Sequence, residues 1–138
     1  MSNRTLIVIK PDAVKKNVIG AILKRFEDEG FTIKMLKMLQ LSRSDAEEFY
    51  SVHRSKPFFN ELVEFITSGP IVAAVVEGND DSTIARVRSI IGVTDPRKAE
   101  KNTIRYLYGS DITMNAIHAS DSVESFQREV KVIFNQAD

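Results

Sequence analysis

Leu6-Ile7-Val8-Ile9 and Ile71-Val72-Ala73-Ala74-Val75-Val76 are the two wholly apolar runs that decide the fold of this chain. Both are short and contain several β-branched residues, which favour strands. Each is followed by turn-forming residues, Pro11 after the first run and Gly78-Asn79-Asp80 after the second. Short apolar runs bounded in this way predict buried strands. We expect the first run to lie at the centre of its sheet.

The segments around these runs show helical spacing of apolar residues. We expect one helix over Ile19 to Phe26, closed by Gly30 as a C-cap. Further helices are predicted to open at the capping box Ser44-Asp45-Ala46-Glu47 and at Pro57. Two more helices are expected further along the chain. One has its apolar stripe over Ile84 to Ile91 and ends at Gly92, and the other has its stripe over Val123 to Ile133.

Two weaker strand signals complete the pattern. Phe31 to Leu41 alternates between apolar and polar residues, which predicts a strand with one wet face. A short strand is expected at Ala116 to His118, after an aperiodic segment from Val93 to Met114 that we expect to be a functional or disordered loop. The order of elements predicts an α+β fold, a ferredoxin-like α/β sandwich in which helices cover a four-stranded antiparallel sheet. Residues 1–138 are expected to form a single domain.

Composition narrows the possible functions. Hydrophobic residues make up 43% of the 138 residues, and 19 basic residues balance 19 acidic ones. A neutral balance gives no general attraction to nucleic acid or to anionic membranes, so any anion site must be local. The chain has no cysteine, which excludes disulfides and thiolate metal sites, and its N-terminus does not resemble a signal peptide. We expect a cytoplasmic protein that binds neither nucleic acid nor membrane.

The stretch Asn115-Ala116-Ile117-His118-Ala119-Ser120-Asp121-Ser122 carries the strongest functional signal. It places His118 after an apolar run and next to residues that start a helix, where free backbone N–H groups attract anions. Asp121 to Glu124 fits a capping box. An imidazole is a nucleophile near neutral pH, so the pattern indicates a histidine poised to accept a phosphoryl group. A packed histidine at a strand end is the alternative interpretation.

A phosphate site here must use side chains, because the six glycines form neither a phosphate-binding loop nor a dinucleotide fingerprint. The candidates are polar residues at element ends or in the long loop, namely Lys10, Arg88, Thr94 and Arg105. Lys10 could instead be a solvated strand end, and Arg88 could lie along the helix surface. Arg105 stands between Ile104 and Tyr106, a poor place for an idle charge.

Other residues have both a functional and a structural interpretation. Glu129 is placed to accept a hydrogen bond from one imidazole nitrogen, or it is an exposed helix charge. Phe58 and Ile112 are either base contacts or residues at the rim of the core. His53 has no discernible partner in the sequence, and we place it at the surface or at a pocket rim.

Five ordered segments give the chain a resemblance to the nucleoside diphosphate kinase family over nearly its whole length. They are Thr5 to Asp12, Lys56-Pro57-Phe58-Phe59, Thr67-Ser68-Gly69-Pro70, Thr103-Ile104-Arg105 and Asn115 to Glu124. The resemblance implies a ferredoxin-like fold and a ping-pong reaction with broad base tolerance. In that reaction His118 takes the γ-phosphate of a triphosphate such as ATP, becomes phosphohistidine and passes the group to a diphosphate.

The same resemblance implies roles for the surrounding residues. They are Lys10 on the γ-phosphate and ribose, Asn115 on the ribose, Tyr50 ordering the centre, Arg88, Thr94 and Arg105 on the phosphates, and Phe58 and Ile112 around the base. Glu129, directly or through Ser120, would orient His118. Mg²⁺ would be carried by the nucleotide phosphates, without a protein-held metal. The family also implies a homo-oligomer built from dimers, a tetramer or a hexamer.

The chain departs from the family pattern in a few places. Tyr106-Leu107-Tyr108 follows Thr103-Ile104-Arg105 where the family usually has a small and then an acidic residue, and Ala119 replaces a common glycine. Asn79 to Thr83 is about two residues longer than usual, and no long C-terminal extension follows. Two alternatives therefore stay open beside the kinase, a non-catalytic nucleotide-binding regulatory module on the same fold and a ferredoxin-like nucleic-acid binder.

Overall fold

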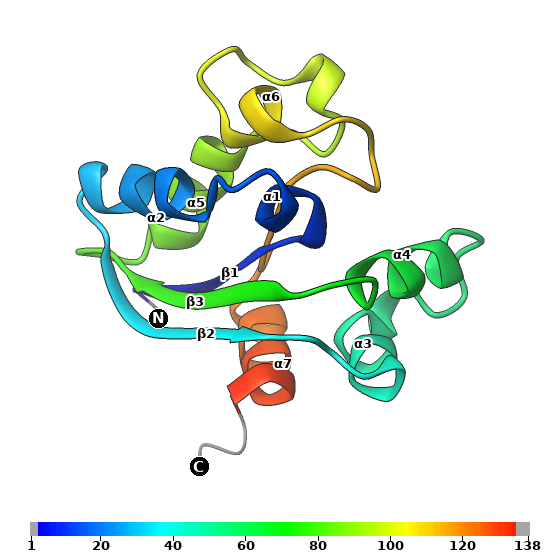
Figure 1. The fold of residues 1–138 in the computed structure, drawn as a ribbon. Coiled ribbons are helices and arrows are strands. Elements are labelled where there is room, and N and C mark those ends of the chain that lie inside the picture. The colour runs from blue at the N-terminus through cyan, green and yellow to red at the C-terminus, as the bar shows by residue number, and fades with distance from the viewer. Residues whose placement is uncertain (1–2, 135–138) are drawn as a thin grey trace.

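The structure is a computed structural model that describes residues 3–134. Four strands form one antiparallel sheet in the order β2-β3-β1-β4 (Figure 1). The strands are β1 (Arg4–Ile9), β2 (Thr32–Leu39), β3 (Ile71–Glu77) and β4 (Ile117–Ala119). The α-helices are α1 (Pro11–Lys15), α2 (Ile19–Asp28), α3 (Arg43–Phe49), α4 (Phe59–Ile66), α5 (Thr83–Ile91), α6 (Ile104–Tyr108) and α7 (Val123–Phe134), with 3₁₀ turns η1 (Ser51–His53) and η2 (Pro96–Lys98).

The two apolar runs are the central strands, as predicted. Leu6 in β1 pairs with Val75 in β3, and the residues of both runs are buried. On its other side β1 pairs with β4, where Val8 lies opposite His118. The register therefore holds His118, on β4, beside the buried strand β1. The loop that precedes β4 lies outside the sheet and can form part of a site.

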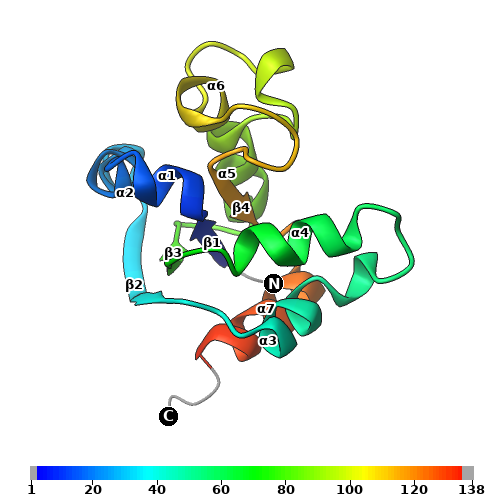
Figure 2. The ribbon, with the colours of Figure 1, turned by 45° about the vertical axis from the view of Figure 1, so that its right-hand side comes forward.

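Side chains of the central strands alternate between two hydrophobic layers. Ile7 and Ile9 pack on the side covered by α2 and α5, whereas Leu6 and Val8 pack on the side covered by α3, α4 and α7. Figures 1 and 2 show α2 and α5 on one face of the sheet and α7 on the other. Burial of a large aliphatic side chain contributes about 1.5–3 kcal/mol, so the two layers together hold the sandwich closed. The ferredoxin-like α+β prediction is confirmed.

Strand β2 differs from the prediction of one wet face. Most of its residues are exposed on both faces, and Leu36 and Met38 are 54% and 58% exposed. The reason is topological, because β2 is an edge strand that pairs only with β3. A register shift between Ile33 and Met35 also interrupts the regular alternation.

Three helix starts lie one or two residues from their expected positions. Helix α3 is capped by Ser42, whose hydroxyl accepts the N–H of Asp45, and not by the predicted box at Ser44. Helix α4 begins at Phe59 and not at Pro57. The N–H of Ser125 is bound by the Ser122 hydroxyl, so the capping role expected of Asp121 falls to its neighbour. At α3 and α7 a nearby residue with similar capping chemistry made the sequence ambiguous, whereas α4 follows Phe58 and has no side-chain cap.

The Gly30 prediction is correct. Its φ of +96° continues the chain out of α2, and its N–H donates to the Glu27 carbonyl at 3.1 Å. The aperiodic segment 93–114 is ordered around η2 and α6, which are capped by Asp95 and Thr103. These two elements are too short to leave a periodic signal. Within residues 3–134, no helix has the length and apolar character required to cross a membrane.

Candidate functional site

A cavity of about 430 Å³ opens where the ends of β1 and β4 meet α5, the 93–116 segment and the residues around η1. Nine of the residues predicted from the sequence line it: Lys10, Tyr50, Phe58, Arg88, Thr94, Arg105, Ile112, Asn115 and His118. His53, Glu61, Leu62, Thr113, Ala119 and Asp121 complete the wall. The other two predicted residues, Ser120 and Glu129, lie behind His118. The fold thus gathers residues that are more than 100 positions apart in the chain.

His118 is held from behind by a buried carboxylate. Its Nε2 lies 2.8 Å from Oε1 of Glu129, and the Ser120 hydroxyl donates to the same oxygen at 2.7 Å. Glu129 comes from α7 and is almost fully buried. In the neutral ring the nitrogen that faces a carboxylate carries the proton, so the lone pair is on Nδ1. The arrangement therefore leaves the Nδ1 lone pair without the carboxylate as a partner.

Three further side chains surround this pair. Nη2 of Arg128 donates to Oε2 of Glu129 at 3.1 Å, which balances the buried carboxylate charge. Phe49 packs edge-on against the His118 ring, with ring centroids 4.9 Å apart. Tyr50 approaches the ring at 6.3 Å, and burial together with the charge of Glu129 raises the pKa of its phenol. Tyr50 thus keeps its proton and can donate a hydrogen bond into the cavity.

Lys10 is the most deeply buried cation of the site, with 4% of its surface exposed. Its Nζ donates to Oδ1 of Asn115 at 2.9 Å and approaches the Thr113 carbonyl at 3.5 Å. Burial, followed by repulsion from Arg105, lowers the pKa of Lys10 from 10.5 to about 7. A phosphate entering the cavity would restore the missing counter-charge, so this ammonium is suited to bind an anion.

Arg105 is buried and is tied to the backbone around the site. Its Nη2 donates to the Ile117 carbonyl at 2.8 Å and its Nη1 to the Gly92 carbonyl at 3.0 Å. Burial and the nearby Arg88 lower its pKa to about 10. Arg105 lines the cavity and also links the residue after α5 to β4. It therefore has a structural role that the sequence did not suggest.

The remaining polar side chains bind backbone carbonyls around the cavity. Nδ2 of Asn115 donates to the Thr94 carbonyl at 3.0 Å, and Nη1 of Arg88 donates to the Ala119 carbonyl at 3.1 Å. Asn115 is buried, whereas Arg88 is exposed at the mouth of the cavity. Lys10, Arg88 and Arg105 thus place three cationic groups around one cavity, an arrangement that suits a polyphosphate.

Two apolar side chains mark the mouth. Phe58 is 40% exposed and Ile112 is 56% exposed, and they come from segments far apart in the sequence. His53 also lies at this rim, as expected, and the structure gives it ring contacts with Tyr50 and with Phe58 at 5.7 Å between centroids. Sequence reasoning missed the bond from the Thr113 hydroxyl to Glu61, 3.0 Å long, because it joins a loop to the first turn of α4, and their proximity has no local signal.

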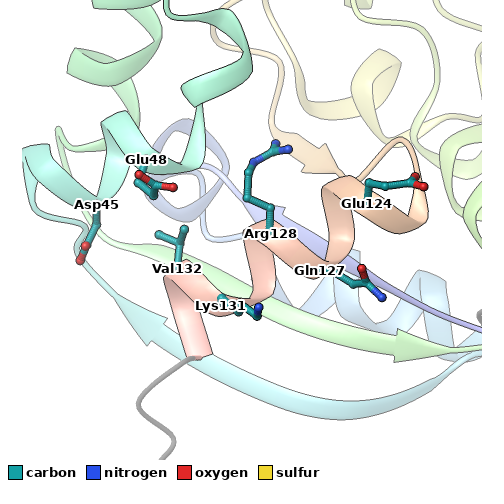
Figure 3. A pocket seen from close by; sticks show the side chains of 7 residues that line it. All are labelled: Asp45, Glu48, Glu124, Gln127, Arg128, Lys131 and Val132. Carbon is teal, nitrogen blue, oxygen red and sulfur yellow. The ribbon is translucent and has the colours of Figure 1, made fainter.

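A second cavity of about 500 Å³ lies between α3 and α7 (Figure 3). Asp45, Glu48, Glu124, Gln127, Arg128, Lys131 and Val132 line it. It shares no lining residue with the first cavity, and its carboxylates make it a poor site for phosphate. Its one link to the candidate site is Arg128, which donates to Glu129.

Fold and site define the class of the protein: a ferredoxin-like α+β domain with a carboxylate-backed histidine in a cation-lined cavity. The model of the family "Nucleoside diphosphate kinase" matches residues 3–138. A nucleoside diphosphate kinase of Staphylothermus marinus is 56% identical over 133 residues, which cover 96% of this chain and 93% of the relative. One of Aquifex aeolicus is 57% identical over 135 residues, 96% of this chain and 94% of the relative.

Solved structures agree with this assignment. The crystal structure of the Aquifex aeolicus nucleoside diphosphate kinase aligns with a TM-score of 0.92 at 56% identity, over 98% of this chain and 96% of that one. A Halobacterium salinarum nucleoside diphosphate kinase in complex with CDP aligns with a TM-score of 0.91 at 38% identity, over 99% and 90%. The chain belongs to the nucleoside diphosphate kinase family, as its resemblance indicated. The catalytic function is supported over the non-catalytic alternative.

Proposed function

We propose that this protein transfers the γ-phosphate of a nucleoside triphosphate to a nucleoside diphosphate through a phosphohistidine on His118. The observation that carries the proposal is the bond between Nε2 of His118 and Glu129, because it leaves the lone pair on Nδ1 of a ring that lines the cavity. A histidine that was only a packing residue would have no need of a buried carboxylate and three cations around it.

The transfer occurs in two balanced steps. The Nδ1 lone pair attacks the γ-phosphorus, an N–P bond forms, and the bond from phosphorus to the bridging oxygen breaks, so the nucleoside diphosphate leaves with that electron pair. A second diphosphate then attacks the phosphohistidine with its terminal oxygen: an O–P bond forms, the N–P bond breaks, and its electron pair returns to Nδ1, which regenerates the imidazole. Glu129 stabilises the positive charge that the ring acquires while it carries the phosphoryl group.

The cationic groups do most of the electrostatic work. Lys10 would contact the γ-phosphate and the ribose, and Arg88, Thr94 and Arg105 would hold the phosphates. Each charge-assisted hydrogen bond contributes about 1.5–3 kcal/mol, so three of them provide useful affinity. Since these donors are fixed before substrate arrives, they can stabilise the transferring group without reorganisation.

The nucleoside would lie between Phe58 and Ile112, with Asn115 on the ribose. Apolar contact with both faces of a base does not depend on its hydrogen-bonding edge, which accounts for a broad base tolerance. The relative from Halobacterium salinarum was solved with CDP, a pyrimidine nucleotide, and this supports nucleotide binding on the same fold.

Mg²⁺ would be carried by the nucleotide phosphates. Among residues 3–134 no group of three or more histidine, cysteine, aspartate or glutamate side chains could hold a metal ion. Asp121 lines the cavity and could bind a water of the hydrated ion. When bound, the cation would neutralise phosphate charge. We also propose a homo-oligomer built from dimers. A cytoplasmic location stays a prediction from the sequence.

Labelling with γ-labelled ATP and Mg²⁺ in the absence of acceptor tests the proposal. We expect acid-labile label on the wild type that is discharged by any added nucleoside diphosphate, and no label on His118→Ala. Asp45→Asn, a substitution on α3 at a residue that does not line the cavity of His118, serves as the control and should retain labelling. Label that persists in His118→Ala would refute the proposal.

A further inference from the structure

The three residues before His118 contain one of the two non-glycine residues with a positive φ in the described part of the chain. Ala116 has a φ of +77°, and the N–H of Ile117 donates to the Asn115 carbonyl at 2.9 Å across it. This is a three-residue turn in a region that residues with a Cβ rarely adopt. The turn determines how Asn115 enters the cavity and where β4, which carries His118, begins.

Helix α1 and the end of β1 supply the hydrogen bonds that hold this turn. The backbone N–H of Lys10 donates to the Ala116 carbonyl at 2.9 Å. Oδ2 of Asp12 accepts the Ala116 N–H at 3.0 Å. Both polar groups of the strained residue are therefore satisfied by the Lys10-Pro11-Asp12 segment, and only one of these bonds comes from a side chain.

We propose that Asp12 is a positioning residue for the phosphoryl transfer, which holds the strained turn at Ala116 and thereby sets the places of Asn115 and His118. This inference rests on the proposed function. Asp12 touches neither the cavity nor the nucleotide, since it is absent from the cavity wall, and it acts only through the turn and through its charge.

The charge of Asp12 has a second effect on the site. Its Oδ1 is buried and has no hydrogen-bond partner among the residues that the structure describes. Burial raises the pKa of Asp12, while the facing Lys10 lowers it. In return, the Asp12 carboxylate supports the charged form of Lys10 against burial and Arg105, with help from Asp111. Asp12 therefore favours the protonated ammonium that would bind the γ-phosphate.

A simpler interpretation is that Asp12 only stabilises α1, where it is the acidic residue of the first turn. That helix has five residues, so the dipole contribution is small. A structural role of this kind predicts a change in melting temperature and no change in the chemistry. Asp45, the acidic residue in the first turn of α3, provides a matched control because it does not line the cavity of the candidate site.

Three variants separate the two functions of the carboxylate. Asp12→Asn keeps an oxygen that can accept the Ala116 N–H and loses the charge. Asp12→Ala loses both. Ala116→Gly in the Asp12→Ala background lets the turn form without support, because glycine adopts positive φ freely. Rates of single-turnover phosphorylation of His118 by ATP are measured from pH 6 to pH 9, together with the melting temperature of each variant.

We expect Asp12→Ala to slow phosphorylation at least tenfold across the pH range. The double variant with Ala116→Gly should be at least threefold faster than Asp12→Ala alone. Asp12→Asn should retain the wild-type rate near pH 6. As the pH is raised, its rate should fall at a lower pH than that of the wild type, because loss of the Asp12 charge lowers the pKa of Lys10 further. Asp45→Asn should match the wild type. A folded Asp12→Ala within twofold of the wild type would overturn the inference, as would absence of rescue. A wild type that takes no label would instead refute the proposed function, and this inference with it.

Discussion

Replacing Lys10 by Met should change the pH dependence of stability in a way that only a buried ammonium can explain. In the folded protein burial and Arg105 lower the pKa of Lys10 from 10.5 to about 7. The unfolded chain therefore binds one more proton than the folded chain between these two values. Stability must rise as the pH is raised through this window, and the rise is lost when Lys10 is removed.

The magnitude follows from the shift. One pKa unit corresponds to about 1.36 kcal/mol, so the folded state loses about 4 kcal/mol at pH 7 by keeping this lysine, and less than about 1 kcal/mol at pH 10. The wild type should thus gain about 3 kcal/mol more than Lys10→Met between pH 7 and pH 10. Methionine has a similar length and fills the same space without charge.

Denaturant unfolding of both proteins at pH 7, 8, 9 and 10 provides the test. Titrations of groups far from Lys10 affect both proteins alike and cancel in the difference between them. We expect Lys10→Met to be the more stable protein at pH 7 and the two to converge toward pH 10. Parallel stability curves would show that Lys10 is solvated in solution and would refute the description of a desolvated anion site.

Three further predictions concern single residues. Gly92→Ala should destabilise the protein by more than about 2 kcal/mol, since an added Cβ would lie 2.7 Å from the Thr103 hydroxyl at a φ of +95°. Gly30→Ala, whose Cβ would meet nothing within 4 Å, should cost only about 1 kcal/mol of backbone strain. Equal losses of unfolding free energy in denaturant would contradict this prediction. Arg105→Ala should lower the unfolding free energy by about 2–4 kcal/mol, because buried carbonyls of Ile117 and Gly92 lose their donor, and an unchanged melting curve would remove its structural role. Phe58→Ala should weaken ADP binding about tenfold by calorimetry and leave the melting temperature within 2 °C, since the ring is 40% exposed; unaltered affinity would exclude base stacking there.

The parts of the fold that the sequence predicted are those whose signal is local. The apolar runs at Leu6 and Ile71 have no other stable arrangement than covered strands, and Gly30 at a helix end has one dominant conformation. Features that depend on tertiary neighbours were missed. The exposure of β2 follows from its place at the sheet edge, and the helix α6 has only five residues.

The candidate site shows the same division. His118 and Glu129 were proposed as partners from a motif and a helix position, and the structure places their side chains 2.8 Å apart. The bonds of Arg105 to two carbonyls and of Asp12 to Ala116 could not be foreseen. The bond of Asp12 involves an alanine with a positive φ, which no sequence preference indicates.

The most direct measurement is to identify which ring nitrogen of His118 carries the phosphoryl group. Nitrogen and phosphorus NMR of the labelled phosphoenzyme distinguishes the two isomers. Because Glu129 binds Nε2, we predict phosphate on Nδ1 alone, and a Glu129→Ala variant should phosphorylate more slowly and less selectively. Phosphate found on Nε2 of the wild type would contradict the account.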